Sequence, residues 1–235
     1  MTQKERAVLL HTMKVFVDAV TAANVTYFIW GGTLLGSYRH HCFIPWDDDL
    51  DIFVDRSQKD ALVETLRRLA PEYLVVEQNR VYQKQKLFSS KDTHPYKERT
   101  WKYPFIDVIL YDFVDNGTVI TEYRRDRRFD AHKVFPLVER PFCGMSLKAP
   151  KDVCYFMQTE FRVDRVEQLE EKCETNDFDH RLGEECGVHR APCSLLWPHY
   201  PFVFRSTLPS AAAGKQRVEE LRFGNKTIWL YSPQP

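Results

Sequence analysis

Four aspartates within five positions are the feature that most restricts how this chain can fold. They stand at or directly before the apolar run "LDIFV", at Asp47, Asp48, Asp49 and Asp51. Like charges this close repel one another, so a fold gains nothing by placing them against its core unless a cation or a proton compensates them. The sequence therefore raises the question of which cation the cluster binds and what chemistry it serves.

Strand geometry indicates how the cluster can hold a metal ion. Side chains alternate along a strand, so Leu50 and Ile52 can face the core while Asp49 and Asp51 point the other way. The Cα atoms of these two aspartates would lie about 6.5 to 7 Å apart, a separation from which two carboxylates converge on one divalent ion. The same alternation predicts that Asp48 points away from this face.

Three other interpretations of the aspartate cluster compete with a metal site. A solvated acidic loop is the common fate of a charge run, but here the run continues into an apolar strand. An EF-hand would need Gly and Glu at its sixth and twelfth positions, where this chain has Ile52 and Gln58. A metal-free acid/base pair stays open, although four carboxylates exceed what that role requires.

A glycine pair lies upstream of the aspartates, and a third carboxylate candidate lies downstream. Gly31 and Gly32 separate a predicted strand, "VTYFIW", from a predicted helix, "TLLGSYRHH", whose first residue, Thr33, is expected to cap it. Without side chains there, a phosphate can approach the backbone at a helix N-terminus. Asp107 is the single charge in "PFIDVIL", which is costly within an apolar strand unless it has a partner.

These blocks resemble the LicD family, which includes bacterial phosphocholine transferases and the animal proteins fukutin and fukutin-related protein. The matching motifs are "WGGTLLG", Arg39, "IPWDDDLDI" and "FIDV", within about residues 5–150. The resemblance implies an α/β (α+β) nucleotidyltransferase-like fold with a mixed sheet flanked by helices. It also implies metal-dependent transfer of phosphocholine or a phospho-alditol such as ribitol phosphate from a CDP-activated donor to a hydroxyl of a glycan, glycoprotein or glycolipid.

The resemblance also assigns roles to individual residues. It implies that Asp49, Asp51 and Asp107 bind Mg²⁺ (or Mn²⁺), and that Asp47 is an accessory carboxylate. Either Asp47 or Asp107 would accept the proton of the acceptor hydroxyl. Donor binding is assigned to four residues, Gly31, Gly32, Thr33 and Arg39. For Arg39, a surface salt bridge is the open alternative.

The remaining sequence predicts one catalytic core and an extension. Helices are expected over residues 4–22 and 58–70, and a hairpin at Asp115-Asn116-Gly117. Residues 1–150 are interpreted as the core. Residues 151–235 are interpreted as an extension packed on it, polar and helical over 151–182 and Pro-rich and irregular over 191–214.

Composition limits the partners and the location. Lys plus Arg equals Asp plus Glu at 33 each, which argues against nucleic acid as a partner, and no apolar run reaches the length of a membrane span. Six cysteines permit disulfides without fixing a pairing, and three glycosylation sequons begin at Asn24, Asn116 and Asn225. Animal members of the family work in the Golgi lumen, so a secretory location is expected for an animal protein and a cytoplasmic one otherwise.

Two other functions remain as alternatives to transfer from a CDP-activated donor. The chain could be a nucleotidyltransferase that acts on a small molecule. It could also be a catalytically inactive glycan-binding or scaffold protein, because only part of its length carries the resemblance.

Overall fold

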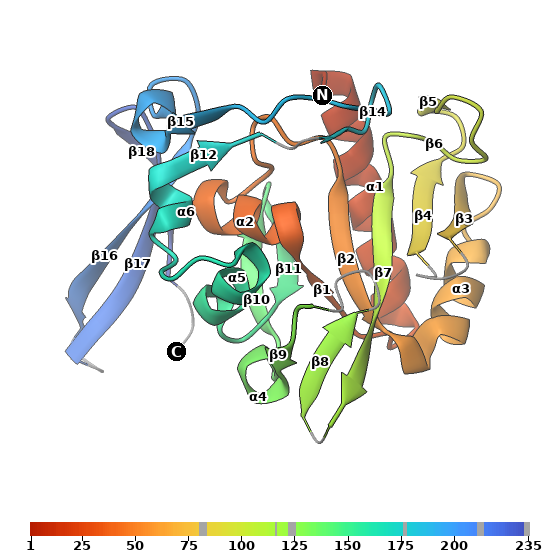
Figure 1. Cartoon of the computed structure of the whole chain (residues 1–235), viewed down its shortest axis with the longest axis horizontal. Helices are drawn as coiled ribbons and strands as arrows, with labels where there is room; N and C mark the ends of the chain where they lie inside the picture. The colour runs from red at the N-terminus through yellow and green to blue at the C-terminus, as the bar shows by residue number, and fades with distance from the viewer. Residues whose placement is uncertain (80–83, 116, 122–125, 176–177, 211–213, 233–235) are drawn as a thin grey trace.

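A mixed β-sheet forms the centre of the protein. The computed structural model describes residues 1–79, 84–115, 117–121, 126–175, 178–210 and 214–232 (Figure 1). The strand order is β1-β2-β7-β4-β3, with β8 paired to β7 and β9 paired to β8. β2 and β7 run parallel, and the other neighbours run antiparallel. The strands are β1 Tyr27–Ile29, β2 Leu50–Asp55, β3 Tyr73–Asn79, β4 Lys84–Ser89, β7 Ile106–Val114, β8 Thr118–Thr121 and β9 Phe129–Asp130.

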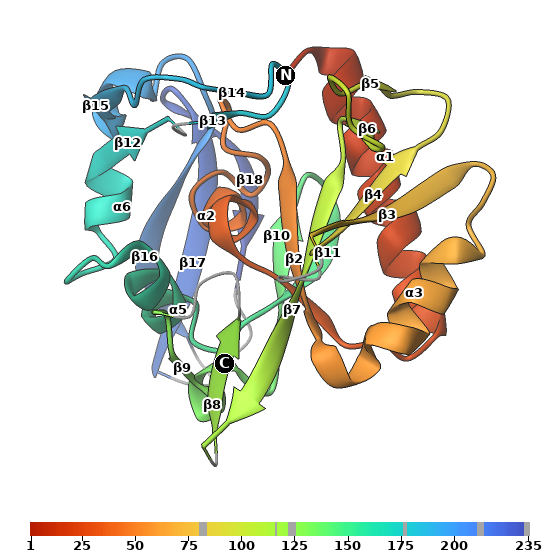
Figure 2. The same ribbon diagram turned by 45° about the vertical axis from the view of Figure 1, so that its right-hand side comes forward.

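Helices pack on both sides of this sheet, as expected for the predicted fold class. Figure 2 shows α1 and α3 on one side of β2 and β7, with α2 and α5 on the other. Two hairpins complete the first 150 residues, one formed by β5 and β6 and the other by β10 and β11. The bounds are α1 Gln3–Ala22, α2 Gly31–His40, η1 Arg56–Gln58, α3 Lys59–Arg67, β5 His94–Pro95, β6 Lys102–Tyr103, α4 Ala131–Val134, β10 Val138–Phe142 and β11 Met145–Ala149.

The first helix confirms the prediction from its periodicity. Leu9, Met13, Phe16 and Val20 recur three or four residues apart, and all four are fully buried in the main core. The Thr2 side chain accepts a hydrogen bond from the backbone N–H of Glu5, and the Glu5 carboxylate accepts one from the backbone N–H of Thr2, which forms a capping box. The helix therefore presents a continuous apolar stripe to the sheet.

The hairpin predicted in the middle of the chain is also confirmed. β7 pairs with β8, and Val114 lies opposite Thr118. Asp115 has a φ of 45°, in the left-handed region that Asp and Asn tolerate better than most residues. Asn116, which carries the sequon at this turn, lies outside the described residues.

Residues beyond 150 differ in part from the sequence-based expectation. The segment predicted as helical over 151–182 contains only two short helices, and short paired strands follow them. The segment predicted as irregular over 191–214 contains β16, part of a three-stranded sheet of order β16-β17-β18. The bounds are α5 Val153–Phe161, α6 Gln168–Glu171, β12 Lys172–Glu174, β13 Phe178–Asp179, β14 Glu184–Glu185, β15 Arg190–Pro192, η3 Cys193–Leu196, β16 Phe202–Ser210, β17 Gly214–Phe223 and β18 Lys226–Tyr231.

The prolines of this region explain why it looked irregular. Pro201 precedes β16 and Pro209 lies within it, but β16 is an edge strand, where a residue without an N–H is tolerated. The extension also shares the main core, because Phe156 and Met157 of α5 are fully buried in it. The division of the chain at residue 150 stays a prediction.

Two disulfides join segments that are distant in sequence. Cys42, just after α2, is bonded to Cys143 in the turn between β10 and β11. Cys173 in β12 is bonded to Cys193, next to the partner strand β15. Among the helices of the described ranges, none combines the length and hydrophobicity that a membrane crossing requires.

Candidate functional site

Three carboxylates converge where β2 and β7 run side by side. Asp51 and Asp107 are direct partners in the parallel register, and Asp49 precedes the first residue of β2. One oxygen from each of the three lies within 4.8 Å of the others, close enough to hold a single metal ion. Leu50 and Ile52 are fully buried in the core, as the alternation predicted. The structure therefore brings together all three residues that the sequence predicted as metal ligands.

The pKa values of these carboxylates shift in opposite directions. Loss of water raises the pKa of Asp49 and raises that of Asp51 well above its usual range, and the neighbouring carboxylates add to both shifts. Burial alone would also raise the pKa of Asp107, but Lys84 and Lys86 hold it below its usual value. The cluster thus contains one compensated carboxylate and two that lack a full counter-charge. This is the electrostatic situation that a bound divalent cation would relieve.

Two lysines from β4, which were not predicted from the sequence as site residues, provide the compensation at Asp107. Lys86 lies opposite Asp107 in the antiparallel register, and its Nζ is 2.6 Å from Oδ1. Lys84 forms an ion pair with Oδ2 of the same carboxylate. Burial lowers the pKa of Lys86 to about 8, and the ion pair with Asp107 opposes this shift. The spacing of two residues between the lysines was the available signal, because it places both on one face of a strand.

The glycine turn lies directly against the acidic cluster. Gly31 has a φ of +52°, and a Cβ built on it would lie 3.2 Å from Oδ2 of Asp51. A Cβ on Gly32 would lie 2.4 Å from Oδ2 of Asp47, which is closer than real Cβ contacts allow. Both glycines are therefore required by the close approach of α2 to the carboxylates.

Thr33 has a different contact from the one predicted. α2 begins at Gly31 after Trp30, and no side chain caps its start, so the prediction that Thr33 caps the helix is wrong. Its hydroxyl instead accepts a hydrogen bond from the backbone N–H of Asp51, at 2.8 Å. Because Thr33 lies inside the first turn rather than before it, its oxygen is free to reach the neighbouring strand. This bond ties the glycine turn to the strand that carries the metal ligands.

Asp48 points toward a segment of the extension. Its Oδ2 accepts the backbone N–H groups of His180 and Arg181, at 2.8 and 3.3 Å, and its Oδ1 lies 2.8 Å from Nδ1 of the His180 ring. Asp48 is not among the residues that line the cavity, but one of its oxygens lies within 4.8 Å of ligand atoms of Asp49 and His180, because Asp48 and Asp49 precede β2 and strand alternation does not separate them. Asp48 is buried, with an exposed fraction of 8%. Its role is to hold the residues around His180 against the site.

His180 places a positive charge beside Asp49. Burial alone would lower its pKa, but Asp49 and Asp48 raise it to about 9, so the ring is protonated at neutral pH. Its Nε2 lies 3.4 Å from Oδ2 of Asp49. Asp48, Asp49 and His180 also form a second group whose ligand atoms lie within 4.8 Å of one another. No sequence signal connects His180 to the aspartates, because 131 residues separate it from Asp49 and no regular element relates them.

Arg39 is buried rather than exposed, so the alternative of a surface salt bridge is wrong. Its Nη1 donates to the backbone oxygen of Leu169 at 2.8 Å, and its guanidinium lies 5.6 Å from the ring centre of Trp46. Burial lowers its pKa to about 10, and Asp47 and Glu170 oppose this shift. Arg39 lines the same cavity as the acidic cluster, and its contact with donor phosphates stays a prediction.

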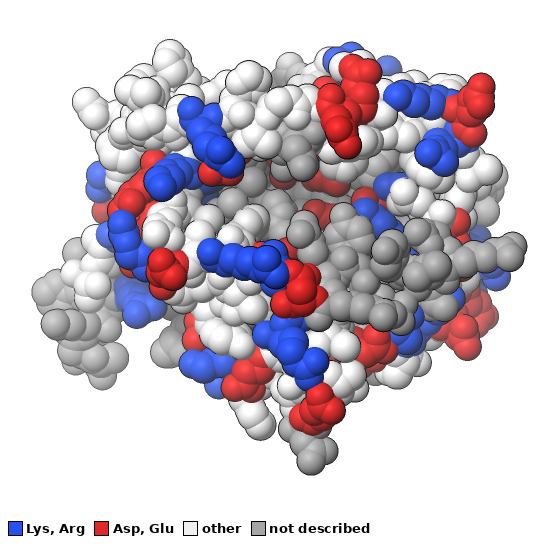
Figure 3. All heavy atoms as spheres, in the orientation of Figure 1, with Lys and Arg blue, Asp and Glu red and all other residues white. Residues whose placement is uncertain are grey.

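A cavity of about 930 Å³ contains these groups. Figure 3 shows a hollow on this face with acidic atoms inside it and basic side chains near its edge. Its lining includes Gly31, Gly32, Arg39, Asp47, Asp49, Asp51, Lys84, Lys86 and Asp107 from the first 150 residues. The extension contributes a further wall: Glu160, Phe161, Val163, Gln168, Leu169, Lys172, Glu174, Thr175, Phe178, His180 and Gly183.

Two characterised proteins are similar to this chain over part of their length. Ribitol 5-phosphate transferase FKRP of Mus musculus is 29% identical over 167 residues, which cover 69% of this chain and 33% of that protein. Lipopolysaccharide cholinephosphotransferase LicD of Haemophilus influenzae is 29% identical over 121 residues, which cover 48% of this chain and 45% of that protein. The matched part of the chain thus spans only a third to just under half of these relatives.

A solved structure and a family profile complete the comparison. The solution structure of the antibiotic-resistance factor ANT(2'')-Ia aligns with a TM-score of 0.43 and 12% identity, over 62% of this chain and 66% of that one. The sequence profile described as "LicD/FKTN/FKRP, nucleotidyltransferase domain" matches residues 24–152, more than half of the chain. That range contains the glycine turn, the aspartate cluster and Asp107. The chain is therefore a member of the LicD family, with the nucleotidyltransferase domain of that family at its centre.

Proposed function

We propose that this chain is a metal-dependent transferase of the LicD type. It moves a phospho-alditol or phosphocholine group from a CDP-activated donor to a hydroxyl of a glycan, on a glycoprotein or a glycolipid. Membership of the family supports the reaction type, since the two relatives are named as a ribitol 5-phosphate transferase and a cholinephosphotransferase. The single observation that carries the proposal is the convergence of Asp49, Asp51 and Asp107 in a cavity beside the glycine turn.

The donor set fits a hard divalent cation. Asp49, Asp51 and Asp107 offer only carboxylate oxygens, which suit Mg²⁺ or Mn²⁺, and the raised pKa values of Asp49 and Asp51 reflect their burial and the carboxylates beside them. A bound ion would neutralise charge on the donor pyrophosphate as its bond breaks. Gly31 and Gly32 leave room for the donor phosphates at the start of α2.

The proton of the acceptor hydroxyl needs a separate group. Asp107 is fully buried and paired with Lys84 and Lys86, which suits a ligand better than a base. Asp47 lies directly against Gly32 in the cavity and belongs to neither three-residue ligand group. We therefore assign proton acceptance to Asp47.

Mass spectrometry of product mixtures tests the proposed function. The protein is incubated with Mg²⁺, a mixture of CDP-activated donors and a panel of glycan acceptors, and we expect a phosphodiester product together with CMP. A thermal-shift series with CDP, CTP, UDP and ATP accompanies it, and we expect metal-dependent stabilisation that is selective for CDP. Transfer of a nucleotide to a small molecule would instead indicate a nucleotidyltransferase. Indifference to every nucleotide would indicate a glycan-binding or scaffold protein.

The glycine turn gives a first specific prediction. Gly32→Ala adds a Cβ that must displace the Asp47 carboxylate from its position 2.4 Å away. We expect CDP affinity to fall about tenfold, by roughly 1.4 kcal/mol, measured by titration calorimetry with Mg²⁺ present. Gly187→Ala is the matched control, because a Cβ there meets no atom within 4 Å, its backbone is not in the left-handed region, and it lies outside the cavity lining. Unchanged affinity in a folded Gly32→Ala protein would remove the glycine turn from the donor site.

The disulfides support a location in an oxidising compartment, such as the lumen of the secretory pathway. We expect non-reducing peptide mapping of protein secreted from animal cells to recover the pairs Cys42–Cys143 and Cys173–Cys193. Cys154 and Cys186 should then react with a thiol reagent after unfolding, because neither belongs to a disulfide. Recovery of six free thiols would contradict this location.

A further inference from the structure

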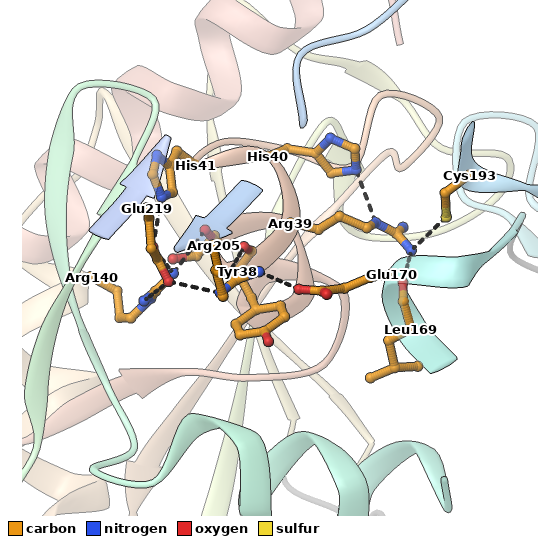
Figure 4. A network of polar contacts seen from close by, with 11 residues as sticks. Tyr38, Arg39, His40, His41, Arg140, Leu169, Glu170, Cys193, Arg205 and Glu219 are labelled. Atoms are coloured by element: carbon orange, nitrogen blue, oxygen red, sulfur yellow. Dashed lines mark hydrogen bonds and ion pairs between the residues drawn. The ribbon is translucent and has the colours of Figure 1, made fainter. Parts of the chain in front are cut away.

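A buried carboxylate of the C-terminal sheet lies at the C-terminal end of α2, opposite the glycine turn. Glu219, on β17, accepts hydrogen bonds from Arg140 at 2.9 and 3.0 Å and from Nε of Arg205 at 3.0 Å, and it lies 2.8 Å from Nε2 of His41 (Figure 4). The side chains of Glu219 and Arg140 are 5% and 6% exposed. One carboxylate therefore organises three partners away from solvent.

Both arginines also contact the last turn of α2. Arg140 donates through Nη2 to the backbone oxygen of Ser37, at 3.3 Å, and Arg205 donates through Nη2 to that of Tyr38. The last four carbonyl groups of a helix have no partner within the helix, and the negative end of the helix dipole favours cations there. The two guanidinium groups satisfy both needs, and Glu219 fixes where they lie.

The opposite end of the same helix is the glycine turn. α2 contains ten residues and is about 15 Å long, so the orientation of its last turn determines where Gly31 and Gly32 meet the carboxylates. Figure 4 shows a second attachment on this side, in which Arg205 forms an ion pair with Glu170 of α6. The C-terminal sheet thus contacts α2 through charged groups instead of apolar packing alone.

We propose that Glu219 is a positioning residue for the donor-phosphate site. It holds Arg140 and Arg205 on the carbonyl end of α2 and thereby fixes the glycine turn against Asp47 and Asp51. The part of this inference that concerns the donor rests on the function proposed above. Its consequence is that the sheet β16–β18, which lies outside the residues matched by the family profile, is part of the catalytic unit.

Hydrogen exchange and ligand titration of Glu219→Gln test this proposal together. We expect the amides of residues 31–36 to exchange about tenfold faster than in the unchanged protein. The affinity for CDP with Mg²⁺ should fall about tenfold, while KM for the glycan acceptor should stay the same. A purely structural role would lower both affinities or the active fraction alike.

Glu220→Gln is the matched control on the same strand. Its carboxylate pairs with Arg222 and Thr227 within the C-terminal sheet, and we expect both amide exchange and CDP affinity to be unchanged. Arg205→Gln replaces a partly exposed member of the network and serves if Glu219→Gln does not fold. It should produce a smaller change in the same direction.

The two measurements separate failure of the positioning role from failure of the proposed function. Unchanged exchange at residues 31–36 in a folded Glu219→Gln protein would overturn the positioning role, and so would equal losses of donor and acceptor affinity. If the unchanged protein binds no CDP but the variant shows faster exchange, the proposed function is wrong and Glu219 still fixes the glycine turn.

Discussion

Asp51→Asn is expected to lower turnover about a thousandfold while the protein stays folded. The change keeps the size of the side chain but removes the charge of a predicted metal ligand, so several kcal/mol of transition-state stabilisation are lost. The measurement is steady-state turnover at saturating Mg²⁺ with the most active donor. Asp55→Asn, at the other end of β2, is the matched control, because its carboxylate contacts Ser57 and lies outside the cavity lining. Turnover within a few fold of normal for Asp51→Asn would exclude the residue from the metal site.

The same variant should melt at a higher temperature than the unchanged protein when no metal is present. The pKa of Asp51 is raised in the folded state by loss of water and by Asp49, so the folded state binds this proton more tightly than the unfolded state does. The contribution of Asp51 to the free energy of unfolding is therefore fully present below the usual aspartate pKa. This contribution is lost as the pH rises through the raised pKa of the folded state. At neutral pH the Asn variant lacks this penalty.

The pH dependence of melting provides the check. With a chelator present, the advantage of Asp51→Asn should shrink as the pH is lowered toward the usual aspartate range. Mg²⁺ should stabilise the unchanged protein more than the variant. A variant that is less stable than the unchanged protein at neutral pH without metal would contradict the uncompensated charge.

Asp107→Asn should behave differently, although the sequence predicts the same ligand role for both aspartates. Removing this charge leaves Lys84 and Lys86 without their shared counter-ion, and Lys86 is almost fully buried. Breaking a buried pair from one side costs about 3 kcal/mol or more. We therefore expect the free energy of unfolding in urea to fall by about this amount, in addition to the loss of turnover.

A double variant tests whether loss of the ion pairs causes the lower stability of Asp107→Asn. Lys86→Met in the Asp107→Asn background removes the buried unpaired ammonium, so part of the lost stability should return. The pKa of Asp107 is lowered, so its contribution is present above the usual aspartate pKa and disappears as the pH falls through the lowered value. Equal stabilities of Asp107→Asn and the unchanged protein at neutral pH would show that the lysines do not depend on this carboxylate.

The parts of the site that the sequence predicts are those set by local geometry. Asp49 and Asp51 could be placed because strand alternation relates neighbours along one strand. Asp107 could be placed because a lone charge in an apolar strand needs a partner. Thr33 was wrongly placed because the boundary of α2 falls two residues earlier than its sequence indicates, and helix ends are poorly determined by local propensity.

The parts that the sequence did not predict depend on pairing across long separations. Lys86 meets Asp107 only through the register of β4 with β7, and His180 meets Asp48 through a segment with little regular structure. The sheet β16–β18 was missed because Pro209 weakens the strand signal of β16, whereas its pairing with β17 decides the structure. The periodicity of hydrophobic residues along the chain does not indicate these pairings, because they depend on contacts between elements that are distant in sequence.

The residues proposed for metal and donor binding come from one part of the chain, and the wall that the extension adds to the cavity comes from another. The carboxylates and the glycine turn belong to β2, β7 and α2, whereas the facing wall comes from residues 160–183. Hydrogen bonds to backbone groups attach this wall to the core: Asp48 accepts from the N–H of His180, Trp46 donates to the oxygen of Glu174, and Arg39 donates to that of Leu169. Because these bonds use backbone groups of the wall, its side chains can be exchanged while the attachments stay in place, so under the proposed function this wall is where acceptor specificity can be redesigned.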